Sequence, residues 1–341
     1  MSTAVEVTGS GSIPVPQARR SLKSRPSGAD LVFWQVSTLS AVAVLLIMLL
    51  VGGFLALRAA NALKVAGFHF VTETAWQPEA GTFGIAGVLT GTVLVGLVAV
   101  SVAIPLATAT ALYISEYAPA RIERTLISLV DLMAAVPSVV YGLWGFFLLQ
   151  YKIVPLAQWL SEHFGFIPGF GISTEGYVKG SALSQTTVFT SSTFIAGIVV
   201  GFMVTPVICA VMREAFSQAP IGEREGAYAL GATRWGMIRT VVLPFGKGGM
   251  IGGSMLGLGR ALGETIAVFM ILSVVPGFQP HIFQNGGSTV SSLIALRYGE
   301  SGGFSISALF AAGLALFAMT LVINFAASSI VARSRSGAES G

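Results

Sequence analysis

The stretch EREGAYALGATRWGMIRTVVLP, from Glu223 to Pro244, lies between two long apolar segments of the chain. Pro220 suits the first turn of a short helix, and the glutamates Glu223 and Glu225 complement the positive N-terminal end of such a helix. Gly231 then permits a sharp break, after which a second helix is expected to run to a stop at Pro244. The stretch therefore predicts two short helices in a polar connection between apolar segments.

The composition around this connection is that of a membrane protein. Of the 341 residues, 54% are hydrophobic and only 10% are charged, whereas soluble domains carry about 25% charged residues. The mean hydropathy is +0.80, and the 41 glycines suit transmembrane helices that approach one another closely. This composition excludes an ordinary soluble globular protein.

A helix needs about 20 apolar residues to cross the roughly 30 Å of hydrocarbon in a bilayer. Six stretches of the chain are long and apolar enough, and the first is too long and too far from the start to be a cleavable signal peptide. We therefore expect an all-α, polytopic membrane protein with six transmembrane helices. The six stretches are Val32–Leu57, Ile85–Leu112, Leu126–Leu149, Phe189–Met212, Gly248–Val275 and Phe304–Val331.

The basic residues predict the orientation of these helices. With the N-terminus in the cytoplasm, thirteen lysines and arginines fall in cytoplasmic segments and five in outer segments. Cytoplasmic segments of membrane proteins carry an excess of basic residues, so both termini are expected in the cytoplasm. The cytoplasmic set is Arg19, Arg20, Lys23, Arg25, Arg121, Arg124, Arg213, Arg224, Arg234, Arg239, Lys247, Arg333 and Arg335, and the outer set is Arg58, Lys64, Lys152, Lys179 and Arg297.

The domain organisation follows from the same pattern. Residues 1–30 are rich in serine, proline and glycine and are expected to be a disordered cytoplasmic leader. Residues 31–332 are expected to form the six-helix transmembrane domain, and residues 333–341 a cytoplasmic tail. The outer loops at residues 150–188 and 276–303 have few apolar repeats, so irregular structure is expected in both.

Residues that would support enzymatic chemistry are few. Cys209 is the single cysteine, and it lies in an apolar run, so the chain has neither an internal disulfide nor a cysteine metal site. The histidines His69, His163 and His281 are far apart and lack the spacing of metal ligands. The G-x-x-x-x-G-K-[ST] phosphate loop is absent, and the nearest fragment, Gly246–Gly248, lacks its spacing. The chain is therefore not expected to be an ATPase or another enzyme.

Two charged residues, Arg260 and Glu264, lie near the middle of the fifth expected span. A charge at this depth costs at least a few kcal/mol, so it should face protein or water. Their spacing of four places both on one helical face, where they can pair. Gly249, Gly253 and Gly257 share this face within about 80° of arc, which indicates close contact with a neighbouring helix. The pair is therefore expected to point into the bundle or a pore.

Two interpretations of Arg260 and Glu264 remain open. In the first, they form a structural salt bridge that locks the fifth span against a neighbour. In the second, they lie on a transport path, where the planar donor fork of arginine matches tetrahedral anions such as phosphate or sulfate. Glu264 would then hold the arginine when no substrate is present. The hydroxyls of Ser138 and Tyr141 could also reach the substrate, although helix packing is an alternative role for both.

The connection at residues 213–247 resembles the EAA motif of ABC importer permeases, E-A-A-x3-G-x9-I-x-L-P. Gly226 replaces an alanine and Val241 an isoleucine, and the glycine should weaken the first helix by up to about 1 kcal/mol. The resemblance implies that this connection docks a separate ATPase. The matching positions are Glu225, Gly226, Ala227, Gly231, Val241, Leu243 and Pro244.

The apolar residues of the same connection agree with docking. The small side chains of Ala227 and Ala229 would let the first helix press its backbone into a groove on a partner. Large apolar side chains exposed here would be unusual without something covering them. Those expected on this face are Tyr228, Leu230, Trp235, Met237 and Ile238.

Several further segments resemble the phosphate-specific transport (Pst) permeases. The resemblance covers about residues 30–331, and an Ile-Ala-Val after Glu264-Thr265 is similar to the PstC subunit, whereas the PstA subunit typically has Ala-Pro there. The segments are AAVPSVVYGLWG at Ala134–Gly145, GRALGETIAV at Gly259–Val268, ALYISEYAP at Ala111–Pro119 and GTFGI at Gly81–Ile85.

The Pst resemblance implies a type I ABC importer permease fold and phosphate import into a prokaryotic cell through its plasma (inner) membrane. It implies a heterodimer with a PstA-like permease, two PstB-like ATPases that bind ATP and Mg²⁺, and a PstS-like phosphate-binding protein outside. The chain itself is expected to bind no cofactor and no nucleic acid. Arg260 and Glu264 match the charged pair of the family's fifth span.

Two alternatives remain open. The first is a permease for another oxyanion, such as molybdate or sulfate. The second is a secondary anion transporter or channel, which would have no use for a docking loop.

Overall fold

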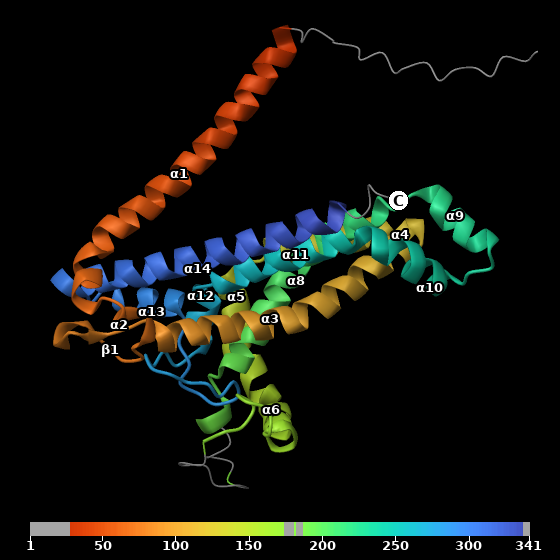
Figure 1. Cartoon of the computed structure of the whole chain (residues 1–341). Coiled ribbons are helices and arrows are strands. Elements are labelled where there is room, and N and C mark those ends of the chain that lie inside the picture. The colour runs from red at the N-terminus through yellow and green to blue at the C-terminus, as the bar shows by residue number, and fades with distance from the viewer. Residues whose placement is uncertain (1–27, 174–180, 182–186, 337–341) are drawn as a thin grey trace, which may run out of the picture. The chain divides into compact units, whose positions relative to one another are not determined.

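The computed structural model describes residues 28–173, 181 and 187–336 (Figure 1). Most of the predicted leader and the last five residues of the predicted tail lie outside the described residues, as does much of the loop after Ser173. The described chain is almost entirely helical, and its elements are α1 Gly28–Ala66, α2 His69–Thr72, β1 Trp76–Gln77, η1 Pro78–Ala80, β2 Thr82–Phe83, α3 Ala86–Leu112, η2 Tyr113–Tyr117, α4 Ala120–Ala135, α5 Ser138–Trp144, η3 Gly145–Leu149, α6 Gln150–Phe164, α8 Thr193–Ser217, α9 Ile221–Ala229, α10 Arg234–Met237, η4 Ile238–Val242, α11 Leu243–Leu262, α12 Ile266–Ile271, α13 Val290–Arg297 and α14 Gly303–Ser336.

The chain divides into two units, one up to Val51 and one from Gly52 onward. The described part of the first unit is the apolar N-terminal portion of α1, which begins at Gly28, so three residues of the predicted leader are helical. The last four described residues of α14 likewise extend into the predicted tail.

Six helical segments of the described residues are long and apolar enough to cross a membrane, which confirms the predicted number. An all-α polytopic protein is therefore the observed fold class. The segments are Gly28–Ala66, Ala86–Tyr117, Ser138–Phe164, Thr193–Ser217, Arg234–Leu262 and Gly303–Ala326.

The third span lies further along the chain than predicted. A continuous helix over Leu126–Leu149 is wrong, because α4 ends at Ala135 and α5 starts at Ser138. The ring of Pro137 disfavours helical backbone at the preceding residue, and Val136 is extended, with φ −65° and ψ 128°. The span therefore runs from α5 through η3, a π-helical turn, to the end of α6.

The prediction of irregular structure from residue 150 is also wrong. The first 15 residues of that loop form α6, and the glycines that favour a loop begin only at Gly165. Val154 and Ala157 on α6 are buried against Phe189 and Phe283. Apolar packing therefore extends the helix beyond the stretch whose composition suggested a span.

The fifth span is helical from Arg234 to Leu262, so the predicted stop at Pro244 is wrong. A proline lacks the N–H that donates within a helix and clashes with the preceding turn. The π-helical turn η4 lies immediately before Pro244 and widens the helix there. At the other end, the expected continuation to Val275 is interrupted at residues 263–265, after which α12 adds only six residues.

The predicted glycine contact of this span is confirmed, and its partner is α8. A β-carbon at Gly249 would collide with Ala215, and one at Gly257 would collide with the side chain of Ile208. At Gly253 it would lie 3.3 Å from the carbonyl oxygen of Ile208. α8 also packs closely on α3, where a β-carbon at Gly201 would lie 2.9 Å from the carbonyl oxygen of Ala99. α3 and α8 contribute most of the largest buried cluster.

The two ends of the bundle differ (Figure 1). At one end lie α9 and α10, together with the C-terminal end of α14. At the other end lie α2 and the β1–β2 hairpin, in which Trp76 pairs with Phe83. Phe70, Trp76 and Phe83 are buried there with residues of α13 and α14. α9 and α10, which form the predicted docking segment, therefore lie at the opposite end of the bundle from the hairpin.

Candidate translocation and docking sites

Two helix breaks adjoin the membrane-spanning helices, one between α4 and α5, before the third span, and one between α11 and α12, after the fifth. The two breaks are neighbours because α5 packs against α12, so closely that a β-carbon added at Gly142 would lie 3.0 Å from the Cα of Ala267. Irregular backbone at membrane depth is tolerated where it is buried in protein or lines a water-filled cavity. Paired breaks of this kind are typical of substrate sites in transporters.

Glu264 lies in the second break and is half-buried. Its Oε1 accepts a hydrogen bond of 3.2 Å from the backbone N–H of Ala267, in the first turn of α12. Its carbonyl oxygen accepts one of 2.7 Å from the Oγ of Ser291, on α13. A carboxylate at the N-terminal end of a helix is favourable, so Glu264 is fixed to α12 and α13.

Arg260 lies in the last turn of α11 and is exposed. Among the described residues, it forms no ion pair with Glu264, so the predicted pairing is wrong for this structure. The reason is the break, because α11 ends at Leu262 and the helical spacing of four no longer relates the two side chains. The charged group of Arg260 therefore remains available to another partner.

Tyr141 and Ser138 lie on the first turns of α5, beside the other break. The Tyr141 hydroxyl donates a hydrogen bond of 3.1 Å to the carbonyl oxygen of Met133, which ties α5 to the end of α4. Ser138 is the first residue of α5 and is half-buried. The contact of Tyr141 with Met133 favours the packing role for this tyrosine.

The docking segment begins with α9, which ends as the sequence predicts. Gly231 has φ +83°, a left-handed conformation that favours glycine. Its N–H donates to the carbonyl oxygen of Tyr228 at 2.9 Å, and the N–H of Ala232 donates to that of Ala227 at 3.0 Å. These two bonds form a Schellman motif, which satisfies the last carbonyls of α9 and turns the chain toward α10.

The expected apolar surface of the docking segment is confirmed in part. Leu230 is 91% exposed and Tyr228 and Trp235 are also exposed. Met237 and Ile238 are buried in the main core instead, so the prediction that they are exposed is wrong. They lie where the helix enters the bundle, and its buried face there packs against the rest of the chain.

The remaining docking positions divide in the same way. Glu225, Gly226 and Pro244 are exposed. Ala227 and Leu243 are half-buried against the core of their own chain, so the small size of Ala227 serves packing within the bundle. Ile221, which the motif does not include, is 72% exposed beside them.

Comparison with known proteins identifies the chain. The family model described as "Binding-protein-dependent transport system inner membrane component" matches residues 101–336. A phosphate transport system permease protein PstC 2 of Mycobacterium tuberculosis is 37% identical over 291 residues, which cover 84% of this chain and 87% of the relative.

The chain belongs to the PstC family of ABC importer permeases. A PstC of Mycobacterium leprae is 38% identical to it over 81% of this chain and 85% of that protein. A PstC of Haemophilus influenzae is 34% identical over 86% of this chain and 90% of that protein. The resemblance stated from the sequence is confirmed, and as a PstC-family permease the chain is a multi-pass, non-enzymatic component of its transporter.

Sequence reasoning missed several contacts in this PstC-family permease. Ser291, which binds the carbonyl of Glu264, lies in a loop that was expected to be irregular. Arg224 stands directly before the motif and was counted only as a cytoplasmic charge, yet it forms an ion pair with Glu116. Glu116 follows the second expected span, which ends at Leu112, so no feature of the sequence singled it out, whereas in the structure the helical segment continues to Tyr117.

Proposed function

We propose that this chain is a subunit of an ABC importer that moves inorganic phosphate into the cytoplasm by alternating access. The observation that carries the proposal is the placement of Arg260 beside two helix breaks, exposed and with no ion pair to Glu264 among the described residues. Its family relatives are named as phosphate permeases, which supports the same anion.

The position of Arg260 restricts what it can face. A guanidinium at membrane depth costs at least a few kcal/mol if it meets lipid. It must therefore face water or a second protein chain. A translocation path between this subunit and a second permease provides both, and the guanidinium fork matches the oxygens of a tetrahedral anion.

Glu264 and the helix break shape the rest of this site. The carboxylate is held at α12 by the Ala267 N–H, close to the path that the anion would follow. Its negative charge would keep phosphate from binding Arg260 too tightly, since repeated transport requires release as well as binding. Tyr141 and Ser138 would contribute hydroxyls at the edge of the site, with Tyr141 mainly holding the α4–α5 junction.

The partners follow from the docking segment. A PstA-like permease would complete the path, and a PstS-like protein would deliver phosphate at the end with the β1–β2 hairpin. Two PstB-like ATPases would bind ATP and Mg²⁺ and dock on α9 and α10. The exposed side chains of Tyr228 and Leu230 support this docking, because large apolar groups are seldom left in water.

The orientation and the domain organisation are part of the proposal. The docking segment would lie in the cytoplasm of a prokaryote, and both termini with it, with residues 31–332 as the membrane domain. The C-terminal end of α14 supports this, because it lies at the same end of the bundle as α9 and α10 (Figure 1). The chain would itself bind no cofactor.

A deletion of the gene for this chain in its host tests the proposed substrate. Uptake of radiolabelled phosphate at low external phosphate should fall to the level of the remaining carriers and return with a plasmid copy. An excess of sulfate or molybdate should not reduce the restored uptake. If phosphate uptake is unchanged while sulfate or molybdate uptake falls, the chain is a permease for that oxyanion instead.

A further inference from the structure

Glu116 is a buried carboxylate at the end of the second span. It lies in η2, the π-helical turn that follows α3, and its side chain is only 3% exposed. A charge buried to this extent is costly unless a partner compensates for it. π-helical turns are rare and occur frequently at functional sites.

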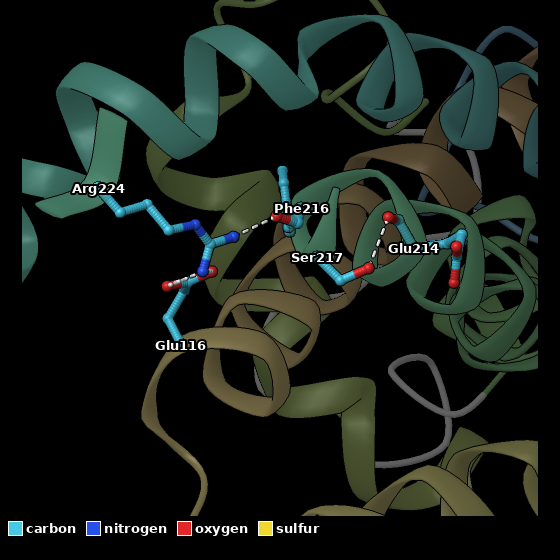
Figure 2. Close-up of polar contacts among 5 residues, drawn as sticks. All are labelled: Glu116, Glu214, Phe216, Ser217 and Arg224. Carbon is cyan, nitrogen blue, oxygen red and sulfur yellow. Dashed lines mark hydrogen bonds and ion pairs between the residues drawn. The ribbon is translucent and has the colours of Figure 1, made fainter. Parts of the chain in front are cut away.

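The partner of Glu116 is Arg224, on α9 of the docking segment (Figure 2). Its Nη1 lies 3.1 Å from Oε1 and donates a hydrogen bond of 3.2 Å to Oε2 of Glu116. Its Nη2 donates a hydrogen bond of 2.6 Å to the carbonyl oxygen of Phe216, in the last turn of α8. One guanidinium thus joins the ends of two membrane helices to the docking helix, and it also meets the negative end of α8.

α9 has few other attachments to the bundle. Of its nine residues, only Arg224 and Ala227 are half-buried, and the other seven are exposed. The second docking helix contacts the same turn, because the guanidinium of Arg234 lies over the ring of Tyr117 at 5.2 Å. Both helices of the docking segment therefore reach η2 through an arginine.

We propose that Glu116 and Arg224 are positioning residues that transmit movement of the docking helix α9 to α3 and α8. The proposal rests on the proposed function, because it assigns a role to a step of ATP-driven transport. A charged pair with a second hydrogen bond to a helix carbonyl fixes both the distance and the orientation of α9 relative to α3 and α8. The single apolar contact at Ala227 does not fix the orientation. When a docked ATPase moves α9, this ion pair would pull the cytoplasmic ends of both spans with it.

The prediction is a loss of coupling with no loss of docking. In the full transporter in proteoliposomes, Glu116→Gln and Arg224→Gln should lower the phosphate moved per ATP hydrolysed by about fivefold or more, the lower range of typical coupling between sites. Arg224→Lys keeps the charge but has no fork to hold both partners, so it should lie between these variants and the wild type. Glu214→Gln is the matched control, because Glu214 is an exposed carboxylate at the same end of α8 whose side chain contacts Gln218 and not α9.

The double variant Glu116→Gln/Arg224→Gln separates coupling from stability. Each single variant leaves one charge of the pair without its partner, whereas the double variant leaves none. We expect the double variant to assemble with the ATPase in normal amounts and to remain uncoupled. A double variant with the wild-type ratio of phosphate to ATP would overturn the proposal, because the pair would then only stabilise the fold. Failure of the double variant to assemble would also overturn it, and so would single variants with an unchanged ratio. If the wild-type complex itself moves no phosphate, the proposed function fails instead.

Discussion

Replacement of Arg260 with glutamine is expected to lower energised phosphate uptake by about 10- to 100-fold. Hydrogen bonds to a charged group are worth about 1.5 to 3 kcal/mol, and about 1.4 kcal/mol corresponds to a factor of ten. Because Arg260 forms no ion pair with Glu264 among the described residues, its removal should not destabilise a partner within the chain. The measurement is the initial rate of labelled phosphate uptake against phosphate concentration.

Two further variants show whether the loss of uptake is specific to the guanidinium of Arg260. Arg260→Lys keeps the charge without the planar fork and should recover only part of the uptake. Lys64→Gln removes an exposed cation from the last turn of α1 and should leave uptake unchanged. If Arg260→Gln takes up phosphate at the normal rate and affinity, Arg260 does not act on the path. If the variant no longer assembles with its partners, the role of Arg260 is to stabilise the fold or the complex.

Removal of the Tyr228 and Leu230 side chains should have the second largest effect. Burial of a large apolar side chain is worth about 1.5 to 3 kcal/mol, so the double alanine variant should bind the ATPase about 100-fold more weakly or worse. The measurement is the amount of ATPase that co-purifies with the tagged permease.

The control for docking is Phe68→Ala. Phe68 is 95% exposed and lies directly before α2, at the end of the bundle opposite the docking segment. Its replacement removes a similar apolar area and should leave ATPase binding unchanged. An ATPase that still co-purifies with the Tyr228→Ala/Leu230→Ala variant in normal amounts would exclude this surface as the docking site.

Local chemistry in the sequence predicted several elements correctly. The left-handed turn at Gly231 and the close packing of Gly249, Gly253 and Gly257 follow from the absence of a side chain. The number of spans follows from apolar length alone. Each of these features depends on the chemistry of the residues that form it, so it can be predicted from the sequence alone.

Errors arose where distant contacts or small backbone adjustments decide the structure. Pro244 lies inside a helix because the wider π-helical turn η4 before it accommodates the proline ring. No residue in the sequence indicates such a turn. α6 persists because its apolar face meets Phe189 and Phe283, which come from later segments. Arg260 and Glu264 have the spacing of a helical pair, but the chain leaves the helix at Gly263 and the carboxylate binds α12 instead. The spacing therefore placed Arg260 and Glu264 in the same region of the fold correctly, but the contact that it predicted between them is wrong.

Phosphate uptake by the purified transporter in proteoliposomes tests the central proposal most directly. The vesicles would hold this chain with its permease partner and ATPases, with ATP and Mg²⁺ enclosed and the phosphate-binding protein outside. The account predicts that labelled phosphate accumulates inside only when ATP, the ATPase and the binding protein are all present, and that excess sulfate or molybdate does not compete. Equal accumulation without ATP or without the ATPase would contradict it, because the chain would then act as a secondary transporter or channel.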